Sequence, residues 1–329
     1  MSSWQLQTPV AFIIFNRPAT TERVFAAIAQ VQPPQLLVVA DGPRRDRPGE
    51  ASACAATRAI IDRVDWECEV LTQYAAANMG CRKRVSSGLD WIFDTVEEAI
   101  ILEDDCLPHP SFFRFCEELL HKYQRDERVA QIGGTNFQFG HRRTCDSYYF
   151  SRFPHIWGWA SWRWAWQHYD VDLSLWPQLR GSDWLQSVFE DPKQTRYWRR
   201  IFDKVAAGDT DTWDYQWALA CWSRGALTAL PDVNLISNIG FGQDSSHTRV
   251  GSPLANIPRE AMQFPLRHPA TVTRNSAADA FTASRVYPTL LPRLLDKARR
   301  DPRGLMRQAR ERGASALSRR QAPGRKTDG

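Results

Sequence analysis

The chain has 329 residues and is 43% hydrophobic, a composition that excludes wholesale disorder and suits one large α/β domain or two small ones. Its apolar runs are too short to cross a membrane, and its seven cysteines are never spaced as C-x-x-C, which argues against a zinc knuckle and for free thiols in a reducing cytoplasm. The net charge of +5 is uneven: Leu290–Gly329 holds twelve Lys and Arg against four Asp and Glu, so this tail carries +8 and the body −3.

Strands and helices alternate along the first part of the chain. Apolar runs predict strands at Pro9–Phe15, Leu36–Ala40, Cys68–Leu71 and Ala99–Leu102. Caps and helical spacing predict helices from Thr20 or Thr21 to Val31, from about Glu50 to Val64, through Val85–Ile92, and from Ser111 to Tyr123. This alternation implies an α/β fold with a doubly wound, largely parallel sheet.

Three carboxylates, Glu103, Asp104 and Asp105, directly follow the strand at Ala99–Leu102. An acidic triplet in a turn is usually just solvated. Here it lies at the carboxyl end of a buried strand, where open α/β sheets bind ligands and where adjacent acids repel each other unless a cation is present. The pattern therefore predicts a binding site for a divalent metal ion that carries a phosphate ligand.

The second half of the chain is rich in tryptophan. After possible strands at Val129–Ile132 and Tyr148–Phe150, five tryptophans fall between Trp157 and Trp166, and Trp213 and others follow. Most of them are expected to form the aromatic core of a helical subdomain. One or two could line a groove for a sugar acceptor, because aromatic faces stack on sugar C–H surfaces.

A second acidic cluster lies at Asp209, Asp211 and Asp214, before an apolar helical run. Acids at a helix start can simply complement the helix dipole, and this alternative stays open for Asp209 and Asp211. Asp214 stands between Trp213 and Tyr215, where partial desolvation would raise its pKa and suit it to act as a general base.

Further on, residues 238–248 combine two glycines with polar residues and His247, which fits either a mobile lid or an ordinary surface loop.

Taken in order, these motifs resemble the GT-A glycosyltransferases, most of all the inverting N-acetylglucosaminyltransferase of N-glycan maturation and bacterial sugar transferases of that kind. The resemblance covers roughly residues 9–250 and rests on Val10-Ala-Phe-Ile-Ile-Phe-Asn-Arg, Val38-Val-Ala-Asp, Ile101-Leu-Glu-Asp-Asp, Trp157-Gly-Trp, Trp213-Asp-Tyr-Gln-Trp and Gly242-Gln-Asp-Ser-Ser-His. It implies a GT-A domain at 1–270 with a doubly wound mixed sheet, divided into a nucleotide half at about 9–125 and an acceptor half at about 126–250 and followed by a tail at 271–329.

The resemblance also assigns roles to residues. It implies that Asp105 ligates Mn²⁺ or Mg²⁺, with His247 a further candidate ligand, and that Asp214 is the catalytic base. Because Tyr215 stands where the family often has a second acid, Asp211 is the alternative base. The residues implied to bind the donor are Arg17, Asp41, Asn78, Arg84, Glu103, Asp104 and Ser246, and those implied to face the acceptor are Trp157, Trp159 and Trp213.

The implied reaction is inverting transfer of a sugar from a nucleotide diphosphate donor, with a UDP-sugar favoured, to a hydroxyl of a glycan or lipid-linked acceptor, as in bacterial polysaccharide synthesis. Two alternatives remain. A sugar nucleotidyltransferase would normally have a glycine-rich basic loop after the first strand, which Asn16-Arg17-Pro18-Ala19 lacks. A degenerate transferase that only binds glycans is the other alternative, and the intact triplet Glu103-Asp104-Asp105 argues against it.

The basic tail mixes leucines with Lys and Arg, and Pro302 and Gly304 divide it into two short amphipathic pieces. A solvated, partly disordered end is the simplest interpretation. Nucleic-acid binding is not expected, because no aromatic residue accompanies the charge. We favour attachment to an anionic membrane surface, which would place a cytoplasmic protein on the inner face of the plasma membrane.

Overall fold

The computed structural model describes residues 4–241 and 253–287. The chain divides into two compact units, Met1–Thr282 and Ala283–Gly329, and the second is described only over residues 283–287. Of the predicted tail, residues 288–329, which include the basic stretch Leu290–Gly329, lie outside the described residues, as do Gly242, Ser246 and His247. None of the helices in the described part has both the length and the apolar content that a membrane span needs.

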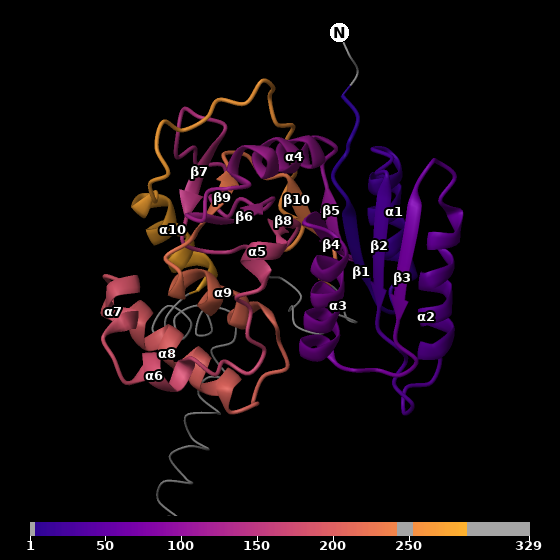
Figure 1. The fold of residues 1–329 in the computed structure, drawn as a ribbon, viewed down its shortest axis with the longest axis horizontal. Helices are drawn as coiled ribbons and strands as arrows, with labels where there is room; N and C mark the ends of the chain where they lie inside the picture. The colour runs from indigo at the N-terminus through magenta and orange to yellow at the C-terminus, as the bar shows by residue number, and fades with distance from the viewer. Residues whose placement is uncertain (1–3, 242–252, 288–329) are drawn as a thin grey trace, which may run out of the picture. The chain divides into compact units, whose positions relative to one another are not determined.

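Strands and helices alternate regularly along the chain up to β4, and their order is irregular after it (Figure 1). The strands are β1 (Val10–Ile14), β2 (Gln35–Ala40), β3 (Glu69–Tyr74), β4 (Glu98–Glu103), β5 (Cys106–Pro108), β6 (Val129–Gly133), β7 (Tyr148–Ser151), β8 (Trp159–Trp162), β9 (Leu227–Pro231) and β10 (Ile236–Asn238). The helices are α1 (Pro18–Ala29), α2 (Glu50–Ala59), the 3₁₀ turn η1 (Ile61–Arg63), α3 (Cys81–Thr95), α4 (Ser111–Tyr123), α5 (Arg163–Trp166), α6 (Trp176–Arg180), α7 (Trp184–Val188), α8 (Pro192–Ala206), α9 (Asp214–Ser223) and α10 (Ser276–Val286).

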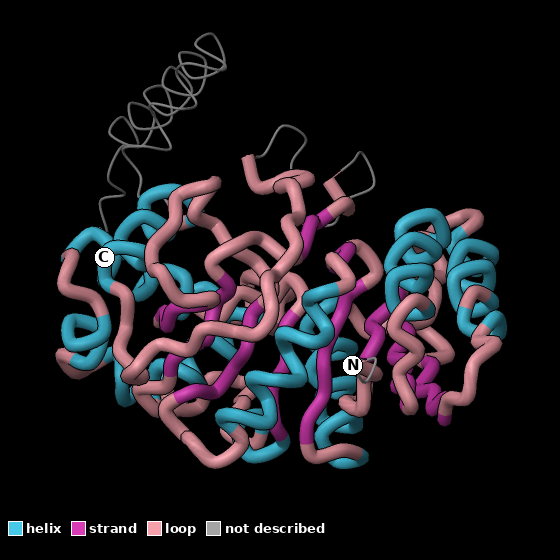
Figure 2. Tube along the Cα trace, turned by 90° about the horizontal axis from the view of Figure 1, so that it is seen from above, coloured by secondary structure: helices cyan, strands magenta, loops and turns pink. Residues whose placement is uncertain are grey.

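The main sheet has eight strands in the order β3-β2-β1-β4-β8-β6-β9-β7. The first four are parallel, β8 runs antiparallel to both β4 and β6, β9 is parallel to β6, and β7 is antiparallel to β9. Figure 2 shows the strands as a layer with helices on both sides. The expected α/β class with a mixed, doubly wound sheet is confirmed.

Burial on both faces explains why the central strands are easy to find in the sequence. Every residue of β1 is buried, and β4 is buried from Ala99 to Leu102, so both are continuous apolar runs rather than alternating ones. The first helix begins at Pro18, earlier than the capping threonines predicted, because proline is well suited to the first helical position and its missing N–H needs no partner there.

The tryptophan-rich segment contains a strand that the sequence did not predict. Trp159–Trp162 forms β8, which pairs with β4 through Ile101 and with β6 through Gly133. All four residues of β8 are buried. The helices α6 to α9, which follow it, gather away from β1–β3 in Figure 1, as expected for a helical subdomain.

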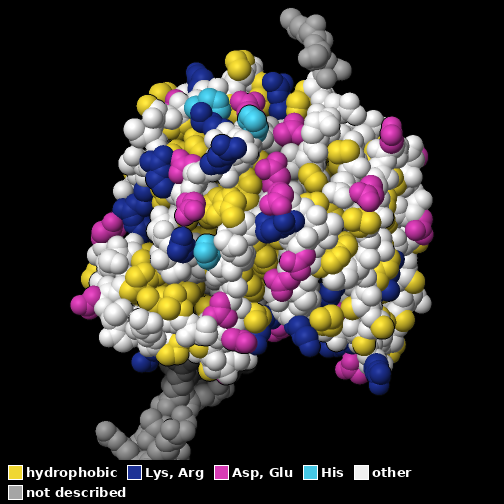
Figure 3. Space-filling view, in the orientation of Figure 1, with side chains coloured by type: hydrophobic (Ala, Val, Ile, Leu, Met, Phe, Trp, Pro, Cys, Tyr) yellow, Lys and Arg dark blue, Asp and Glu magenta, His cyan; other side chains and the backbone are white. Residues whose placement is uncertain are grey.

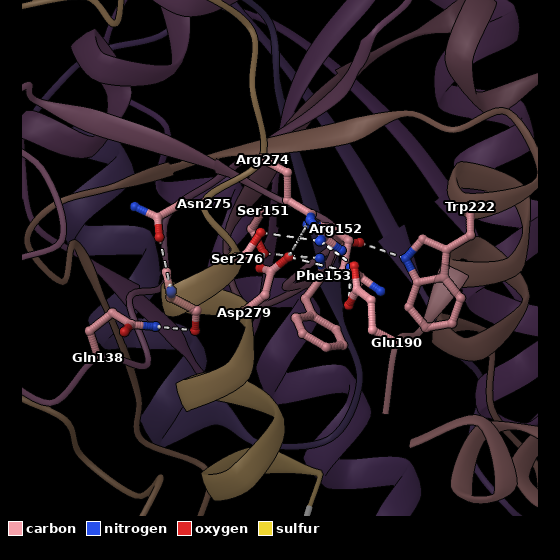
Figure 4. Close-up of polar contacts among 11 residues, drawn as sticks. Gln138, Ser151, Arg152, Phe153, Glu190, Trp222, Arg274, Asn275, Ser276 and Asp279 are labelled. Atoms are coloured by element: carbon pink, nitrogen blue, oxygen red, sulfur yellow. Dashed lines mark hydrogen bonds and ion pairs between the residues drawn. The ribbon is translucent and has the colours of Figure 1, made fainter. Parts of the chain in front are cut away.

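A buried polar network holds the start of α10 against β7 (Figure 4). The Ser151 hydroxyl donates to Asp279 (2.6 Å), and the Arg152 backbone N–H donates to the same carboxylate (3.3 Å). Arg152 also pairs with Glu190 (3.4 Å), to which Arg274 donates as well (2.6 Å). Burial raises the pKa of Asp279 to about 6, although the hydrogen bonds from Ser151 and Arg152 oppose this shift.

Candidate active site

The polar residues that follow β1, β2 and β4 meet at one edge of the main sheet. β1 lies between the other two strands, with Ile13 opposite Glu103 and Ile14 opposite Ala40. Because the three strands are parallel, the residues that follow them emerge at the same edge, where open α/β sheets bind ligands. On the face shown in Figure 3, acidic and basic side chains lie close together near the middle of the surface.

Arg17 and the acids after β4 form a compact charged cluster. The Arg17 Nη1 atom lies 2.8 Å from Asp105 Oδ2 and 3.6 Å from Asp104 Oδ1, while Asp104 Oδ2 accepts the backbone N–H of Phe15 at 3.1 Å. Burial alone would lower the pKa of Arg17, but Asp104, Asp105 and Glu103 outweigh it, so the pKa is raised. The cluster thus brings three carboxylates to one guanidinium.

The acids also act on one another. Burial, followed by the charges of Asp105, Asp104 and Asp214, raises the pKa of Glu103 to about 8. Burial and Asp105 raise the pKa of Asp104 to about 7, against the opposing effects of Arg17 and of the Phe15 N–H. Burial and repulsion at this edge of the sheet therefore favour the protonated forms of both acids, and a bound cation would favour the charged forms.

The last residue of β10 and the two residues after it pack directly on Asp105. The Asn238 side chain donates to Asp105 Oδ1 (3.3 Å), and the Ile239 backbone N–H donates to the Asp105 carbonyl (2.8 Å). A Cβ atom on Gly240 would lie 2.1 Å from Asp105 Oδ2, so only glycine fits there. Asn238 and Gly240 therefore belong to the site, and the sequence analysis gave Asn238 no role.

Asp41 lies at the end of β2 and is 7% exposed. Its Oδ1 accepts the backbone N–H groups of Gly42 (2.8 Å) and Met79 (2.9 Å), and its Oδ2 accepts the Asn78 side chain (2.8 Å). Burial raises the pKa of Asp41, although these backbone hydrogen bonds oppose it. Asn78 thus holds Asp41 in place.

Arg84, the other residue of this segment implied to bind the donor, is 5% exposed. Its guanidinium donates to the carbonyl (2.7 Å) and side chain (2.8 Å) of Gln73 on β3. Burial lowers its pKa. The structure therefore places Arg84 against β3, near enough to Asp41 for each charge to act on the pKa of the other, and the donor-binding role that the resemblance implies for Arg84 stays a prediction.

The two candidate bases differ in their partners. Asp211 accepts the backbone N–H groups of Cys81 (3.0 Å) and Arg82 (2.9 Å), one with each carboxylate oxygen. Asp214 is the first residue of α9, accepts a hydrogen bond from the Thr212 hydroxyl, and is near enough to Glu103 to raise the pKa of that side chain. Of the two, Asp214 is the one whose charge acts on Glu103 of the carboxylate cluster.

The tryptophans expected on the acceptor side fall into two groups. Trp159 and Trp213 are 0% and 2% exposed and stack on each other with ring centroids 5.8 Å apart, in a cluster that includes Trp166 and Trp217. Both are core residues with no ring face left for a ligand, which corrects their acceptor-side assignment. Trp157 is only partly buried and contacts Phe241 edge-on (5.7 Å), so it alone of the three can reach a ligand.

The carboxylate oxygens at this edge suit a divalent metal ion that arrives with a phosphate ligand. Among the described residues, no three His, Cys, Asp or Glu side chains converge as a complete protein cage. Mg²⁺ and similar ions that serve nucleotide substrates need only one or two carboxylates, with phosphate oxygens and water as the other ligands. Asp105 and Asp104 provide such a pair of oxygen ligands.

No protein-family model matches the sequence, and no curated protein matches it either. Among solved structures, a mannosyltransferase from Pyrobaculum calidifontis in complex with GDP-Man and Mn²⁺ is 13% identical over 67% of this chain and 70% of its own, with a TM-score of 0.39. A UDP-glucose pyrophosphorylase with UDP-glucose is 10% identical over 68% and 90%, with a TM-score of 0.35. A 4-diphosphocytidyl-2C-methyl-D-erythritol synthase from Anaerococcus prevotii is 12% identical over 60% and 84%, with a TM-score of 0.30. Likeness at these values carries no conclusion about activity.

Proposed function

We propose that this protein is a metal-dependent GT-A glycosyltransferase that transfers a sugar, with inversion, from a nucleotide diphosphate donor to a hydroxyl acceptor. The observation that carries the proposal is the cluster of Arg17, Asp104 and Asp105 at the carboxyl edge of β1 and β4, with Asp214 close by. A cation-binding group, an anion-binding group and a carboxylate base are the three parts that such a reaction needs.

The donor would bind across the ends of β1, β2 and β4. Asp105 and Asp104 would hold Mn²⁺ or Mg²⁺, which supplies positive charge to stabilise the departing nucleoside diphosphate. The Arg17 guanidinium can bind a phosphate oxygen, since its five N–H donors fit phosphate geometry. Asp41, with its partner Asn78, would place the nucleoside, and Glu103 would lie beside the sugar.

Asp214 would remove the proton from the acceptor hydroxyl. Its position at the start of α9, partly exposed and near Glu103, suits a base on the side of the donor where an acceptor enters. Direct attack by the acceptor inverts the anomeric centre and needs no covalent intermediate. Asp211 is less suited because both of its oxygens already accept backbone N–H groups.

The connection after β1 argues against a nucleotidyltransferase. β1 ends at Ile14 and α1 begins at Pro18, so only residues 15–17 separate them, which leaves no room for a glycine-rich loop that could hold a triphosphate. We favour a UDP-sugar and a glycan or lipid-linked acceptor, as the sequence resemblance implies.

A thermal-shift screen of nucleotide sugars, with and without Mn²⁺, tests the proposal, followed by a turnover assay of the ligands found. A donor at a hundred times its Kd should stabilise the protein by about 2.7 kcal/mol. We expect this gain only with metal and donor together, and its loss in Asp105→Asn. Release of pyrophosphate from a nucleoside triphosphate and a sugar phosphate would contradict the proposal, and donor binding without any turnover would point to a glycan-binding module.

A further inference from the structure

The segment Asn78–Arg82 lies between two carboxylates that come from opposite halves of the protein. On the nucleotide side, Asp41 accepts the Met79 N–H and the Asn78 side chain. On the acceptor side, Asp211 accepts the Cys81 and Arg82 N–H groups from a position 130 and 129 residues further along the chain. One short segment therefore connects the site expected for the nucleoside to the loop that carries the candidate base.

The sequence of this segment explains why the second contact comes from so far away. The N-cap of α3 is Gly80, which has no side chain to accept the first N–H groups of the helix. Gly80 adopts a φ of +83°, and a Cβ there would lie 3.0 Å from Asp211 Oδ2, so a residue able to cap the helix locally would disturb the approach of Asp211. The cap that α3 lacks is supplied instead by the acceptor-side loop.

The same loop fixes Asp214. Trp213, two residues after Asp211, is buried in the tryptophan cluster, and the Thr212 carbonyl accepts the Gln216 side chain at 2.8 Å within the first turn of α9. The Thr212 hydroxyl donates to Asp214 itself. Residues 211–214 are therefore held at one end by α3 and at the other by the core, with little freedom in between.

We propose that Asp211 is a positioning residue that clamps the loop carrying Asp214 to the nucleotide-side segment Asn78–Arg82. This proposal rests on the proposed function, because it takes Asp214 to be the catalytic base. By fixing the distance between the donor and the base, the clamp would act on the rate of transfer, because a displacement of about 1 Å from a reactive geometry can cost about 100-fold in rate. The affinity for the donor should change less than the rate, because Asp41 keeps its own hydrogen bonds to Asn78 and Met79.

The test compares Asp211→Ala and Asp211→Asn with Asp209→Ala, which removes the same charge from an exposed residue of the same loop. Hydrogen exchange is measured in peptides that cover residues 78–84 and 209–216. We expect exchange in Asp211→Ala to accelerate about fivefold or more in both segments, as loss of an N-cap predicts. Asp211→Asn should retain part of the protection, since its amide oxygen still accepts one N–H, and Asp209→Ala should match the wild type.

Kinetics with the donor found in the screen complete the test. We expect kcat to fall about 10- to 100-fold in Asp211→Ala, less in Asp211→Asn and not at all in Asp209→Ala, with the donor Kd changing less than kcat in both Asp211 variants and not at all in Asp209→Ala. Faster exchange confined to residues 78–84, or a wild-type kcat in Asp211→Ala, would overturn the clamp and leave Asp211 as a helix cap alone. If the wild type turned over no nucleotide sugar, the proposed function would fail, and exchange in the two segments would still decide whether the clamp exists.

Discussion

Replacing Arg17 by glutamine should have opposite effects on the metal and on the donor. The guanidinium lies 2.8 Å from Oδ2 of Asp105, the carboxylate proposed to ligate the metal, and the two side chains are only 22% and 17% exposed. Opposite unit charges about 4 Å apart attract by about 4 kcal/mol at the effective dielectric typical of such sites. A metal ion must displace this guanidinium, so its removal should favour metal binding. A gain of only 1.4 kcal/mol would tighten Mn²⁺ binding about 10-fold.

The assay is titration of the nucleotide-free protein with Mn²⁺, with the free ion followed by electron paramagnetic resonance. Arg23→Gln is the matched control, because Arg23 is an exposed residue of α1, the helix that follows Arg17, and its loss changes the net charge equally. We expect tighter Mn²⁺ binding in Arg17→Gln alone, together with weaker binding of UDP, since a phosphate-binding group is lost. Unchanged or weaker Mn²⁺ binding in Arg17→Gln would refute the idea that Arg17 and the metal compete for Asp105.

Two further predictions concern the base and the response to acid. Asp214→Asn should lower kcat by about 10²–10⁴ with donor affinity nearly unchanged, measured by steady-state kinetics and calorimetry, whereas equal losses of kcat and of folding stability would mark a structural residue. His155 is 3% exposed, and burial lowers its pKa to about 3. The unfolded chain therefore binds a proton below pH 6.5 that the folded protein excludes, so urea unfolding should show a loss of about 2 kcal/mol between pH 6.5 and 5 that His155→Gln lacks.

Much of the nucleotide half could be predicted from the sequence because its strands are buried on both faces. The runs that became β1, β2 and β4 are continuously apolar, and helices with clear periodicity separate them. The same burial on both faces is the reason why β8 could not be predicted from the sequence. A strand covered on both faces shows no alternation, and Trp159–Trp162, placed among further tryptophans, could not be distinguished by pattern from buried helix.

The site could be predicted only in part, for a related reason. The location of residues that directly follow apolar strands, such as Arg17 and Asp105, can be predicted from the sequence, because parallel strands end at one edge of the sheet. Asn238 and Asp211 reach the site through contacts with residues more than a hundred positions away in the chain, and no local pattern records such pairings. Trp213 was wrongly assigned to the acceptor side because it adjoins Asp214, the candidate base, whereas its ring is buried in the core.

The charges at the sheet edge indicate what kind of ligand the site suits. Glu103, Asp104 and Asp105 bring three carboxyl groups to the single guanidinium of Arg17, and burial with mutual repulsion raises the pKa values of Glu103 and Asp104, so the edge favours an added cation. A cation at Asp105 displaces Arg17 from the carboxylate, and the freed guanidinium then needs an anion within reach, because a partly buried charge without a partner is costly. A ligand that brings a divalent cation and an anionic group together meets both needs at once. A metal-bound nucleotide diphosphate has this character, whereas a neutral glycan supplies neither charge, and this is why we favour a transferase over a module that only binds sugars.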